Sequence, residues 1–307
     1  MSKKFKFIDL FAGIGGIRIP FEEFGGECVF SSEWDKFSQI TYKANFGETP
    51  HGDITKINAE DIPEHDLLVG GFPCQAFSQA GLKKGFQDTR GTLFFDIARI
   101  LKYHKPKAFL LENVKHLRGH DGGKTFKTIV SVLRELGYQT IEYKILNAKD
   151  FGVPQNRERI FIFGYLDFIF FEFPEPTKVQ TKVGEILDDE VADNFTISDK
   201  MWTSAKRRKE NNRKRGYGFG FSLFNHDSEY TSTISARYYK DGSEIWIDQE
   251  GKNPRMLTPN EARKLQGFPE GFQIPVSNLQ AYKQFGNSVS VPVIQKIAEN
   301  IVEIIKI

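Results

Sequence analysis

The segment Phe5-Lys6-Phe7-Ile8-Asp9-Leu10-Phe11-Ala12-Gly13-Ile14-Gly15-Gly16 joins a short apolar run to three closely spaced glycines. We predict a strand over Phe5–Leu10, a glycine turn, and a helix over about Ile17–Phe24. Glycine permits tight turns and a close approach of backbone to ligand. A strand that enters a helix through such a turn is typical of the ligand-binding edge of an α/β sheet.

The same alternation of apolar runs and helix-like segments continues through the first half of the chain. This pattern indicates an α/β fold, with a mainly parallel sheet covered by helices. We predict further strands at Glu27–Ser32, Leu67–Gly70, Ala108–Glu112, Thr140–Leu146 and Arg159–Gly164, and helices at Lys36–Asn45, Leu93–Tyr103 and Thr125–Leu136. The last two strands are close enough in sequence to pair as neighbours.

The character of the sequence changes near Phe173-Pro174-Glu175-Pro176. A polar stretch rich in Lys, Arg and Asn follows, and then come glycine- and tyrosine-rich segments with short β-like runs. We therefore predict a catalytic and cofactor-binding domain over residues 1–176, completed by the C-terminal segment 286–307. A smaller, mostly β and irregular domain is predicted over 177–285. Val291–Ile305 is apolar at helical spacing and should pack on the first domain.

The composition excludes several classes of protein. Cys28 and Cys74 are the two cysteines in 307 residues, too few for a disulfide framework or a multi-thiolate zinc site. The start lacks the apolar stretch of a secretory signal, and no apolar run reaches the length of a membrane span, so we expect a cytoplasmic protein without membrane contact. His116 and His120 have metal-ligand spacing but no evident third ligand, so we expect no metal. The net charge of +2 leaves nucleic-acid binding open.

Polar side chains follow the first two predicted strands at the edge where a nucleotide binds such sheets. Glu33 comes about twenty residues after the glycine turn, where a carboxylate can accept hydrogen bonds from ribose hydroxyls. Trp34 offers a flat face for a purine, and Asp53 can accept from an exocyclic amine. This pattern fits S-adenosylmethionine or a dinucleotide. The spacing of Gly13, Gly15 and Gly16 departs from the dinucleotide fingerprint and favours the former.

A thiol, a carboxyl group and guanidinium groups follow the later strands. Cys74 comes after the third strand, and as a thiolate it would be a nucleophile. Glu112 ends the fourth strand. Arg157 and Arg159 stand two residues apart, so we expect them on one face of the next strand. Ion pairing is the structural alternative for these arginines.

Six motifs in order resemble those of the DNA (cytosine-5) methyltransferases, and the compact length is similar to that of the bacterial type II modification enzymes. The resemblance implies a Rossmann-like mixed sheet of seven strands with flanking helices, together with a target-recognition domain. It covers nearly the whole chain except about residues 177–250. The motifs are Phe11–Gly16, Glu33-Trp34, Gly71-Phe72-Pro73-Cys74-Gln75, Glu112-Asn113-Val114, Gln155-Asn156-Arg157-Glu158-Arg159 and Gln284-Phe285-Gly286-Asn287-Ser288-Val289.

The resemblance implies a covalent mechanism on a cytosine. The Cys74 thiolate would add to carbon 6, protonated Glu112 would hydrogen-bond ring nitrogen 3, and Arg159 would hold the carbonyl oxygen. Gln75 and Arg157 complete the catalytic set that the motifs imply. The base must be flipped out of the duplex to be reached. The glycine-bearing loop 76–91 would be the lid that closes over it.

The resemblance also implies S-adenosylmethionine as the methyl donor. The residues expected to border it come from the successive strand ends, from Thr92 and Leu93, and from the C-terminal segment. They are Phe11, Gly13, Gly15, Glu33, Trp34, Asp53, Ile54, Leu93, Asn287 and Val289.

A basic cluster over Lys206–Lys209 and Arg213–Arg215 indicates contact with phosphates of double-stranded DNA, although such a run is also typical of a solvated surface. The segments 216–220 and 233–240 are candidates for loops that read base edges, with Arg237 and Lys240 best placed to meet guanine. The predicted DNA-binding residues are Lys83, Arg207, Arg208, Arg215, Thr233, Arg237, Tyr239 and Lys240. The segment 255–269 resembles the family motif that organises this domain, with Asn260 where Arg is more common.

Three other functions fit part of the sequence. A transfer-RNA cytosine-5 methyltransferase has the same motifs, but those relatives carry a Cys-Phe-Thr signature and this chain has no cysteine after Cys74. A catalytically silent DNA-binding module would not need Cys74, Glu112 and Arg159. A nicotinamide-dependent oxidoreductase would bind NAD rather than S-adenosylmethionine. We expect a monomer that acts on DNA, with a cognate restriction endonuclease as a further possible partner.

Overall fold

A computed structural model describes residues 5–73, 93–177 and 179–305 of the chain. Their contacts divide the chain into two compact units. The first unit contains residues 1–146, 158–175 and 293–307, and the second contains 147–157 and 176–292. The segment 147–157 and residues 286–292 thus group with the second unit, although we assigned them to the first domain from the sequence.

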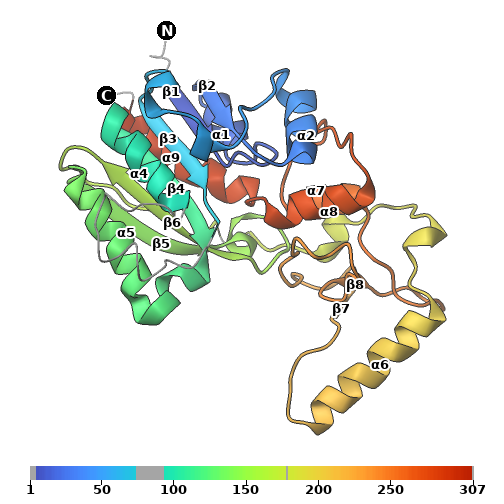
Figure 1. Cartoon of the computed structure of the whole chain (residues 1–307). Coiled ribbons are helices and arrows are strands. Elements are labelled where there is room, and N and C mark those ends of the chain that lie inside the picture. Colours follow the sequence, from blue (N-terminus) through green and yellow to red (C-terminus); the bar gives the residue numbers. More distant parts are fainter. Residues whose placement is uncertain (1–4, 74–92, 178, 306–307) are drawn as a thin grey trace. The chain divides into compact units, whose positions relative to one another are not determined.

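The first unit is built on a mixed sheet with the strand order β2-β1-β3-β4-β6-β5 (Figure 1). The strands from β1 to β4 run parallel to their neighbours, and β6 is antiparallel to β4. The described residues form six strands of this sheet rather than the expected seven. They are β1 (Lys6–Leu10), β2 (Glu27–Ser32), β3 (Leu67–Gly71), β4 (Ala108–Val114), β5 (Thr140–Asn147) and β6 (Glu158–Tyr165). The predicted neighbouring positions of β5 and β6 are confirmed.

Helices cover both faces of this sheet. α4 (Leu93–His104) and α5 (Lys124–Glu135) bury apolar stripes in one continuous core with Ile8, Leu68 and other strand residues. α1 (Arg18–Glu23) packs on the other face, where Phe21 contacts Phe7, and Figure 1 shows α9 (Val291–Ile305) behind the sheet. α2 (Lys36–Phe46) follows β2. The structure confirms all of these predicted helices.

Short 3-10 helices fill several connections. They are η1 (Ile54–Lys56), η2 (Ala59–Asp61), η4 (Lys115–Arg118), η5 (His120–Gly123), η6 (Ala148–Phe151), η7 (Val183–Ile186) and η8 (Asp193–Phe195). Asp53 caps η1, since its carboxylate accepts from the Thr55 backbone N–H at 3.1 Å. The capping roles of such residues restrict where their side chains point.

The second unit is more helical than we predicted from the sequence. Its described residues contain one pair of two-residue parallel strands, β7 (Leu223–Phe224) and β8 (Trp246–Ile247), and three α-helices. These helices are α6 (Asp199–Lys214), α7 (Pro259–Leu265) and α8 (Asn278–Asn287). The expected β structure is therefore largely missing from the described residues, whereas the irregular segments that we also expected are present. The polar run 199–214 forms a helix because Lys, Arg, Glu and Ala favour helices and Ser198 caps its start.

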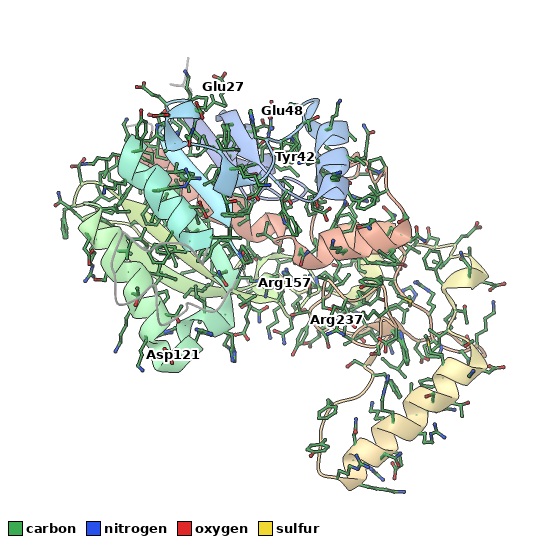
Figure 2. The ribbon with its side chains drawn as sticks, in the orientation of Figure 1. Glu27, Tyr42, Glu48, Asp121, Arg157 and Arg237 are labelled. Atoms are coloured by element: carbon green, nitrogen blue, oxygen red, sulfur yellow. The ribbon has the colours of Figure 1, made fainter. Side chains whose placement is uncertain are left out.

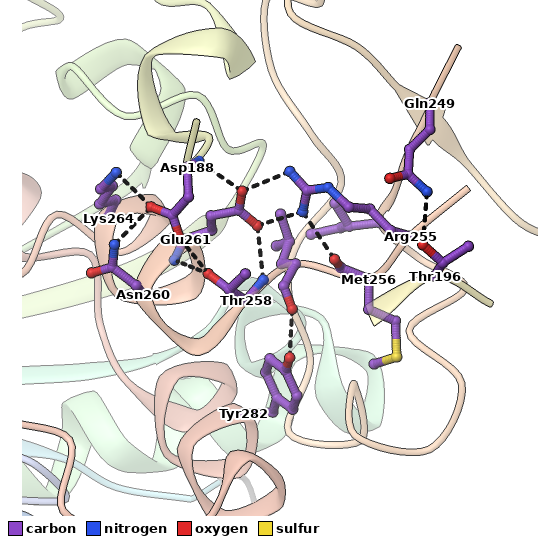
Figure 3. A network of polar contacts seen from close by, with 12 residues as sticks. Asp188, Thr196, Gln249, Arg255, Met256, Thr258, Asn260, Glu261, Lys264 and Tyr282 are labelled. Atoms are coloured by element: carbon purple, nitrogen blue, oxygen red, sulfur yellow. Dashed lines mark hydrogen bonds and ion pairs between the residues drawn. The ribbon is translucent and has the colours of Figure 1, made fainter. Parts of the chain in front are cut away.

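A buried ion pair organises the end of this unit (Figure 3). Arg255 donates from both terminal nitrogens to the two carboxylate oxygens of Glu261, each at 2.7 Å, and the two side chains are 7% and 0% exposed. Glu261 also completes a capping box with Thr258 at the start of α7. Asn260, which departs from the family pattern, donates to Asp188 at 2.7 Å, and Lys264 pairs with the same carboxylate. Asn260 thus contributes a hydrogen bond to this network, and the network's ion pairs are made by Arg255 and Lys264.

Candidate active site

The carboxyl group and a guanidinium group expected from the sequence meet at the edge of the first unit's sheet. Arg159 Nε lies 3.0 Å from Glu112 Oε1, and the side chains are 17% and 12% exposed. Arg159 pairs with Val114 across the antiparallel β4–β6 ladder, which places it diagonally opposite Glu112 on the same face. Burial lowers the pKa of Arg159, and the charge of Glu112 partly offsets this shift. The pair presents a carboxyl group and a cation at one point of the edge.

Asn113 connects this edge to the end of β3. Its side-chain amide donates to the Phe72 carbonyl at 2.7 Å, and the residue is 2% exposed. Beside it, a Cβ on Gly71 would lie 3.2 Å from Glu112 Oε2, so glycine leaves room for the carboxylate. We did not single out the role of Asn113 from the sequence, although it stands within the motif. Cys74 and Gln75, which follow within three residues of Phe72, lie outside the described residues.

Arg157 does not share the position of Arg159. It precedes β6, is 2% exposed, and belongs to the second unit (Figure 2). Its guanidinium donates to the carbonyls of Ile234 at 3.2 Å, Gly286 at 3.1 Å and Ser288 at 2.5 Å. These backbone contacts correct the expectation that both arginines lie on one face of the strand. They favour a positioning role for Arg157, because it holds three segments of its own unit together.

The glycine turn after β1 is tied to the end of β2. Glu33, 8% exposed, accepts hydrogen bonds from the Gly13 backbone N–H at 2.8 Å and from the Asp35 N–H at 2.7 Å. Burial raises the pKa of Glu33, while these backbone donors oppose that shift. The expected proximity of Gly13 and Glu33 is therefore present in the first unit.

The shape of the turn depends on glycine and on an aromatic ring below it. Gly15 has φ +84°, and a Cβ there would lie 2.2 Å from the ring of Phe46. The guanidinium of Arg18 stacks over the same ring, 4.4 Å from its centroid. A Cβ on Gly13 would meet nothing closer than 4.0 Å, so this side of the turn is open. Phe46 and Arg18 have no motif spacing that would have revealed this role from the sequence.

Other predicted cofactor residues have varied environments. Trp34 is 77% exposed, which leaves its ring accessible to a ligand, whereas Ile54 is 3% exposed. Asp53 accepts from the Thr55 hydroxyl at 2.8 Å, and Leu93 begins α4. Phe11 adopts φ +56° at the start of the turn.

In the second unit, Asn287 ends α8 and Val289 is 6% exposed. Their expected contact with a cofactor stays a prediction.

The predicted DNA-binding residues that the structure describes all belong to the second unit. Tyr238 is fully buried, donates to the Ile245 carbonyl and accepts from the Leu257 N–H, both at 2.7 Å. It fixes a loop on which the neighbouring Arg237 (Figure 2) and Lys240 are exposed. Thr233 donates to the Asn156 carbonyl, and Tyr239 is half-buried. Arg207, Arg208 and Arg215 lie on or directly after α6, and Lys83 lies outside the described residues.

Comparisons with known proteins agree with this arrangement. The family model of the C-5 cytosine-specific DNA methylases matches residues 5–303. The type II methyltransferase M1.ScrFI of Lactococcus lactis subsp. cremoris is 61% identical over 99% of this chain and 80% of its own length. M.SsoII of Shigella sonnei is 62% identical over 97% and 80%, respectively. The crystal structure of S. pombe Dnmt2 has a similar fold, with a TM-score of 0.81 and 20% identity over 99% of this chain and all of that one.

The Glu–Arg pair and the glycine turn lie on a mixed α/β sheet, a fold that this chain shares with solved methyltransferase structures. The chain belongs to the C-5 cytosine-specific DNA methylase family, and it is a DNA (cytosine-5) methyltransferase. The family match does not favour the transfer-RNA alternative. Among the described helices, none is long and apolar enough to cross a membrane.

Proposed function

We propose that the protein transfers a methyl group from S-adenosylmethionine to carbon 5 of a flipped-out cytosine within a short specific sequence of duplex DNA. The observation that carries this proposal is the pairing of Glu112 with Arg159 at the edge of the sheet, 3.0 Å apart and mostly shielded from water. In this arrangement the carboxyl group can hydrogen-bond to a ring nitrogen, and the guanidinium can hydrogen-bond to a neighbouring carbonyl oxygen. Both groups are found on one edge of cytosine.

Three side chains of the protein would act directly on the cytosine ring. The Cys74 thiolate forms a bond to carbon 6, while Glu112 donates a proton toward ring nitrogen 3 and Arg159 stabilises the carbonyl oxygen. The electron density that this addition places on the ring makes carbon 5 nucleophilic. After methylation a base removes the carbon 5 proton, and the electrons of that C–H bond re-form the double bond between carbons 5 and 6. The bond from carbon 6 to the Cys74 sulfur breaks, which releases the thiolate, and the proton on ring nitrogen 3 returns to Glu112. Gln75, which follows Cys74 in the motif, completes the proposed catalytic set, and Arg157 positions segments of the second unit.

The residues after β1 and β2 fit S-adenosylmethionine. The open side of Gly13 admits a ligand, Glu33 can accept from ribose hydroxyls, and exposed Trp34 can stack on adenine. Phe11, Gly15, Asp53, Ile54, Leu93, Asn287 and Val289 complete the proposed cofactor set. When bound, the cofactor supplies an electrophilic methyl group on its sulfonium. The protein's part is to orient this group and exclude water from it.

The DNA would be held by the second unit. Arg207, Arg208 and Arg215 are proposed to contact phosphates, and Thr233, Arg237, Tyr239 and Lys240 are proposed to border the bases. Extrusion of the target cytosine costs roughly a few kcal/mol, which these contacts must offset. M1.ScrFI and M.SsoII are named as type II methyltransferases. We therefore propose that this protein belongs to a restriction–modification system whose endonuclease acts on the same sequence. We also propose that it is a monomer in the bacterial cytoplasm.

A covalent-trapping experiment tests the mechanism. Bisulfite sequencing of DNA from cells that express the protein would first map its site. A duplex with 5-fluorocytosine at the target should then form a complex that survives denaturing electrophoresis, because fluorine cannot leave as a proton does. Cys74→Ser should abolish both the complex and turnover but leave S-adenosylmethionine binding largely intact. Full activity in this variant would refute the proposal.

Cys28 supplies the matched control for this experiment. Burial raises the pKa of its thiol to about 12, so it carries little thiolate near neutral pH. Cys28→Ser should therefore form the trapped complex at the rate of the natural protein. Loss of trapping in Cys28→Ser but not in Cys74→Ser would mean that Cys28, and not Cys74, is the nucleophile.

A further inference from the structure

A local excess of positive charge lies on α6 and at its C-terminal end. Residues 199–221, here named the α6 arm, comprise α6 and the segment that returns from it toward β7 (Figure 1). Between Asp199 and Arg215 stand eight Lys and Arg residues and two acidic ones, an excess larger than the net charge of +2 of the whole chain. Such a local excess attracts a polyanion even though the protein is nearly neutral.

The returning segment presents two aromatic rings to water. Tyr217 and Phe219 are 53% and 65% exposed, and their rings stack with centroids 5.2 Å apart and planes 22° from parallel. Their backbone is held against α6, since the Tyr217 N–H donates to the Asn212 carbonyl at 2.9 Å and the Asn212 amide donates to the Phe219 carbonyl at 3.1 Å. The rings are therefore fixed at an exposed position and do not result from a fraying end.

The next aromatic residue along the segment, in contrast, is packed against the core of its unit. Phe221 stacks on Trp246, 5.4 Å between centroids, and Lys209 lies over its ring at 4.2 Å. Phe221 thus secures the segment to the small core formed by Ala205, Trp246 and their neighbours. Tyr217 and Phe219 take no part in that core. The packing of the unit does not bury these two rings, so their apolar faces are available to contact a bound partner.

We propose that Tyr217 and Phe219 contact bases of the bound DNA while the surrounding cations of the α6 arm contact its phosphates. This inference rests on the proposed function. Duplex DNA supplies both chemistries that the arm presents, because it combines a dense row of phosphates with apolar base edges and faces. Aromatic contacts with bases add affinity without releasing counterions, whereas cation–phosphate contacts give affinity that falls with salt. The two contributions can therefore be separated.

The experiment measures how salt affects binding of a duplex that contains the mapped site, over about 50 to 200 mM salt. Replacing both rings, Tyr217→Ala with Phe219→Ala, should weaken binding roughly 10- to 100-fold and leave the slope of log affinity against log salt unchanged. Replacing Arg207 and Arg215 with Ala should make that slope, which is negative, shallower by about 2. Tyr217→Phe keeps both rings and should retain the affinity, which separates loss of the ring from loss of the hydroxyl.

The first unit offers a matched control. Phe168 and Phe170 have the same two-residue spacing and are 85% and 83% exposed, far from the α6 arm in sequence. Their double replacement by Ala should leave DNA affinity within about twofold, because residues 166–175 around them contain no Lys or Arg to hold a phosphate. Equal losses in the two double variants would overturn the proposal, as would unchanged affinity on loss of Tyr217 and Phe219.

Two further outcomes separate this inference from RNA binding and from the proposed function. If removal of the two rings weakens binding of transfer RNA more than binding of duplex DNA, the arm serves RNA and the inference is wrong. If the natural protein produces no 5-methylcytosine in any duplex, the proposed function itself fails. If it methylates DNA and the double variant binds as tightly as the natural protein, the function stands and this inference alone is refuted.

Discussion

The guanidinium of Arg159 lies 3.0 Å from the carboxylate of Glu112, across two strands that run in opposite directions. β4 supplies the carboxyl group as it leaves the sheet, and β6 supplies the cation as it enters. The antiparallel pairing therefore brings together residues 47 positions apart in sequence at the same edge. A parallel neighbour of β4 would have its first residues at the opposite edge of the sheet.

Glu112→Gln should lower kcat by about two orders of magnitude, since the amide keeps the shape of the side chain but cannot transfer a proton to the ring. Binding of S-adenosylmethionine, measured by calorimetry, should change little. Glu158→Gln is the control, because Glu158 adjoins Arg159 in sequence but pairs with Lys115 at the surface. A Glu112 variant with the natural kcat would exclude Glu112 as the proton donor.

Asn113 donates a hydrogen bond to the carbonyl of Phe72, and we expect this bond to position the Cys74 thiol for its attack on the ring. Asn113→Asp has the same size but cannot donate this hydrogen bond, and it should slow formation of the 5-fluorocytosine adduct roughly tenfold or more while cofactor affinity is retained. Asn300→Asp is the matched control, since Asn300 donates a similar bond to the Glu172 carbonyl. If both variants trap DNA at the natural rate, Asn113 has no positioning role.

Much of the first unit could be predicted from the sequence because its signals are local. Apolar runs such as Leu67–Gly71 and the helical spacing of Val291–Ile305 determine where these elements lie. The position of Arg157 could not be predicted, since its guanidinium bonds to carbonyls of Ile234, Gly286 and Ser288, between 77 and 131 residues away. Position within a motif does not reveal such partners.

In the second unit, α6 could not be predicted from the sequence. The run that became α6 lacks the apolar stripe that marks an amphipathic helix, so its polarity suggested an irregular segment. Its helix rests on intrinsic propensity, a cap at Ser198 and a narrow contact through Ala205 and Trp202 with Trp246. Trp246 is 44 positions from Trp202, and the sequence does not show that they meet.

Gly15→Ala should weaken cofactor binding, because a Cβ there would lie 2.2 Å from the Phe46 ring at a backbone φ of +84°. Gly47→Ala separates the two causes, since Gly47 has φ +77° with nothing within 4 Å of its Cβ position. Both variants should lose about 1–2 kcal/mol of stability from the left-handed backbone. Gly15→Ala should lose more, and it alone should bind S-adenosylmethionine more weakly in calorimetry. Equal cofactor affinity in the two variants would contradict the proposed role of the turn.

Asp9 should make stability depend on pH. It is fully buried in β1, and neither carboxylate oxygen has a hydrogen-bond partner among the described residues. Burial raises its pKa to about 8, although nearby Arg18 opposes the shift. That guanidinium is itself occupied by Glu22 at 2.7 Å, by Tyr42 at 2.9 Å and by Glu48. Asp9 is therefore expected to be largely protonated in the folded protein at neutral pH.

Between about pH 4 and pH 8 the folded protein retains a proton on Asp9 that the unfolded chain releases, so stability should fall as pH rises through this window. Asp9→Asn has no proton to lose and should melt at a higher temperature than the natural protein at pH 8, with the difference shrinking toward pH 5. Melting temperatures of both proteins at four pH values measure this. Asp167→Asn, at an exposed position, leaves Asp9 in place, so its melting temperatures should follow those of the natural protein at each pH. If the melting temperature of Asp9→Asn differs from that of the natural protein by the same amount at every pH, the Asp9 carboxyl has the same pKa in the folded and the unfolded chain, and the prediction is wrong.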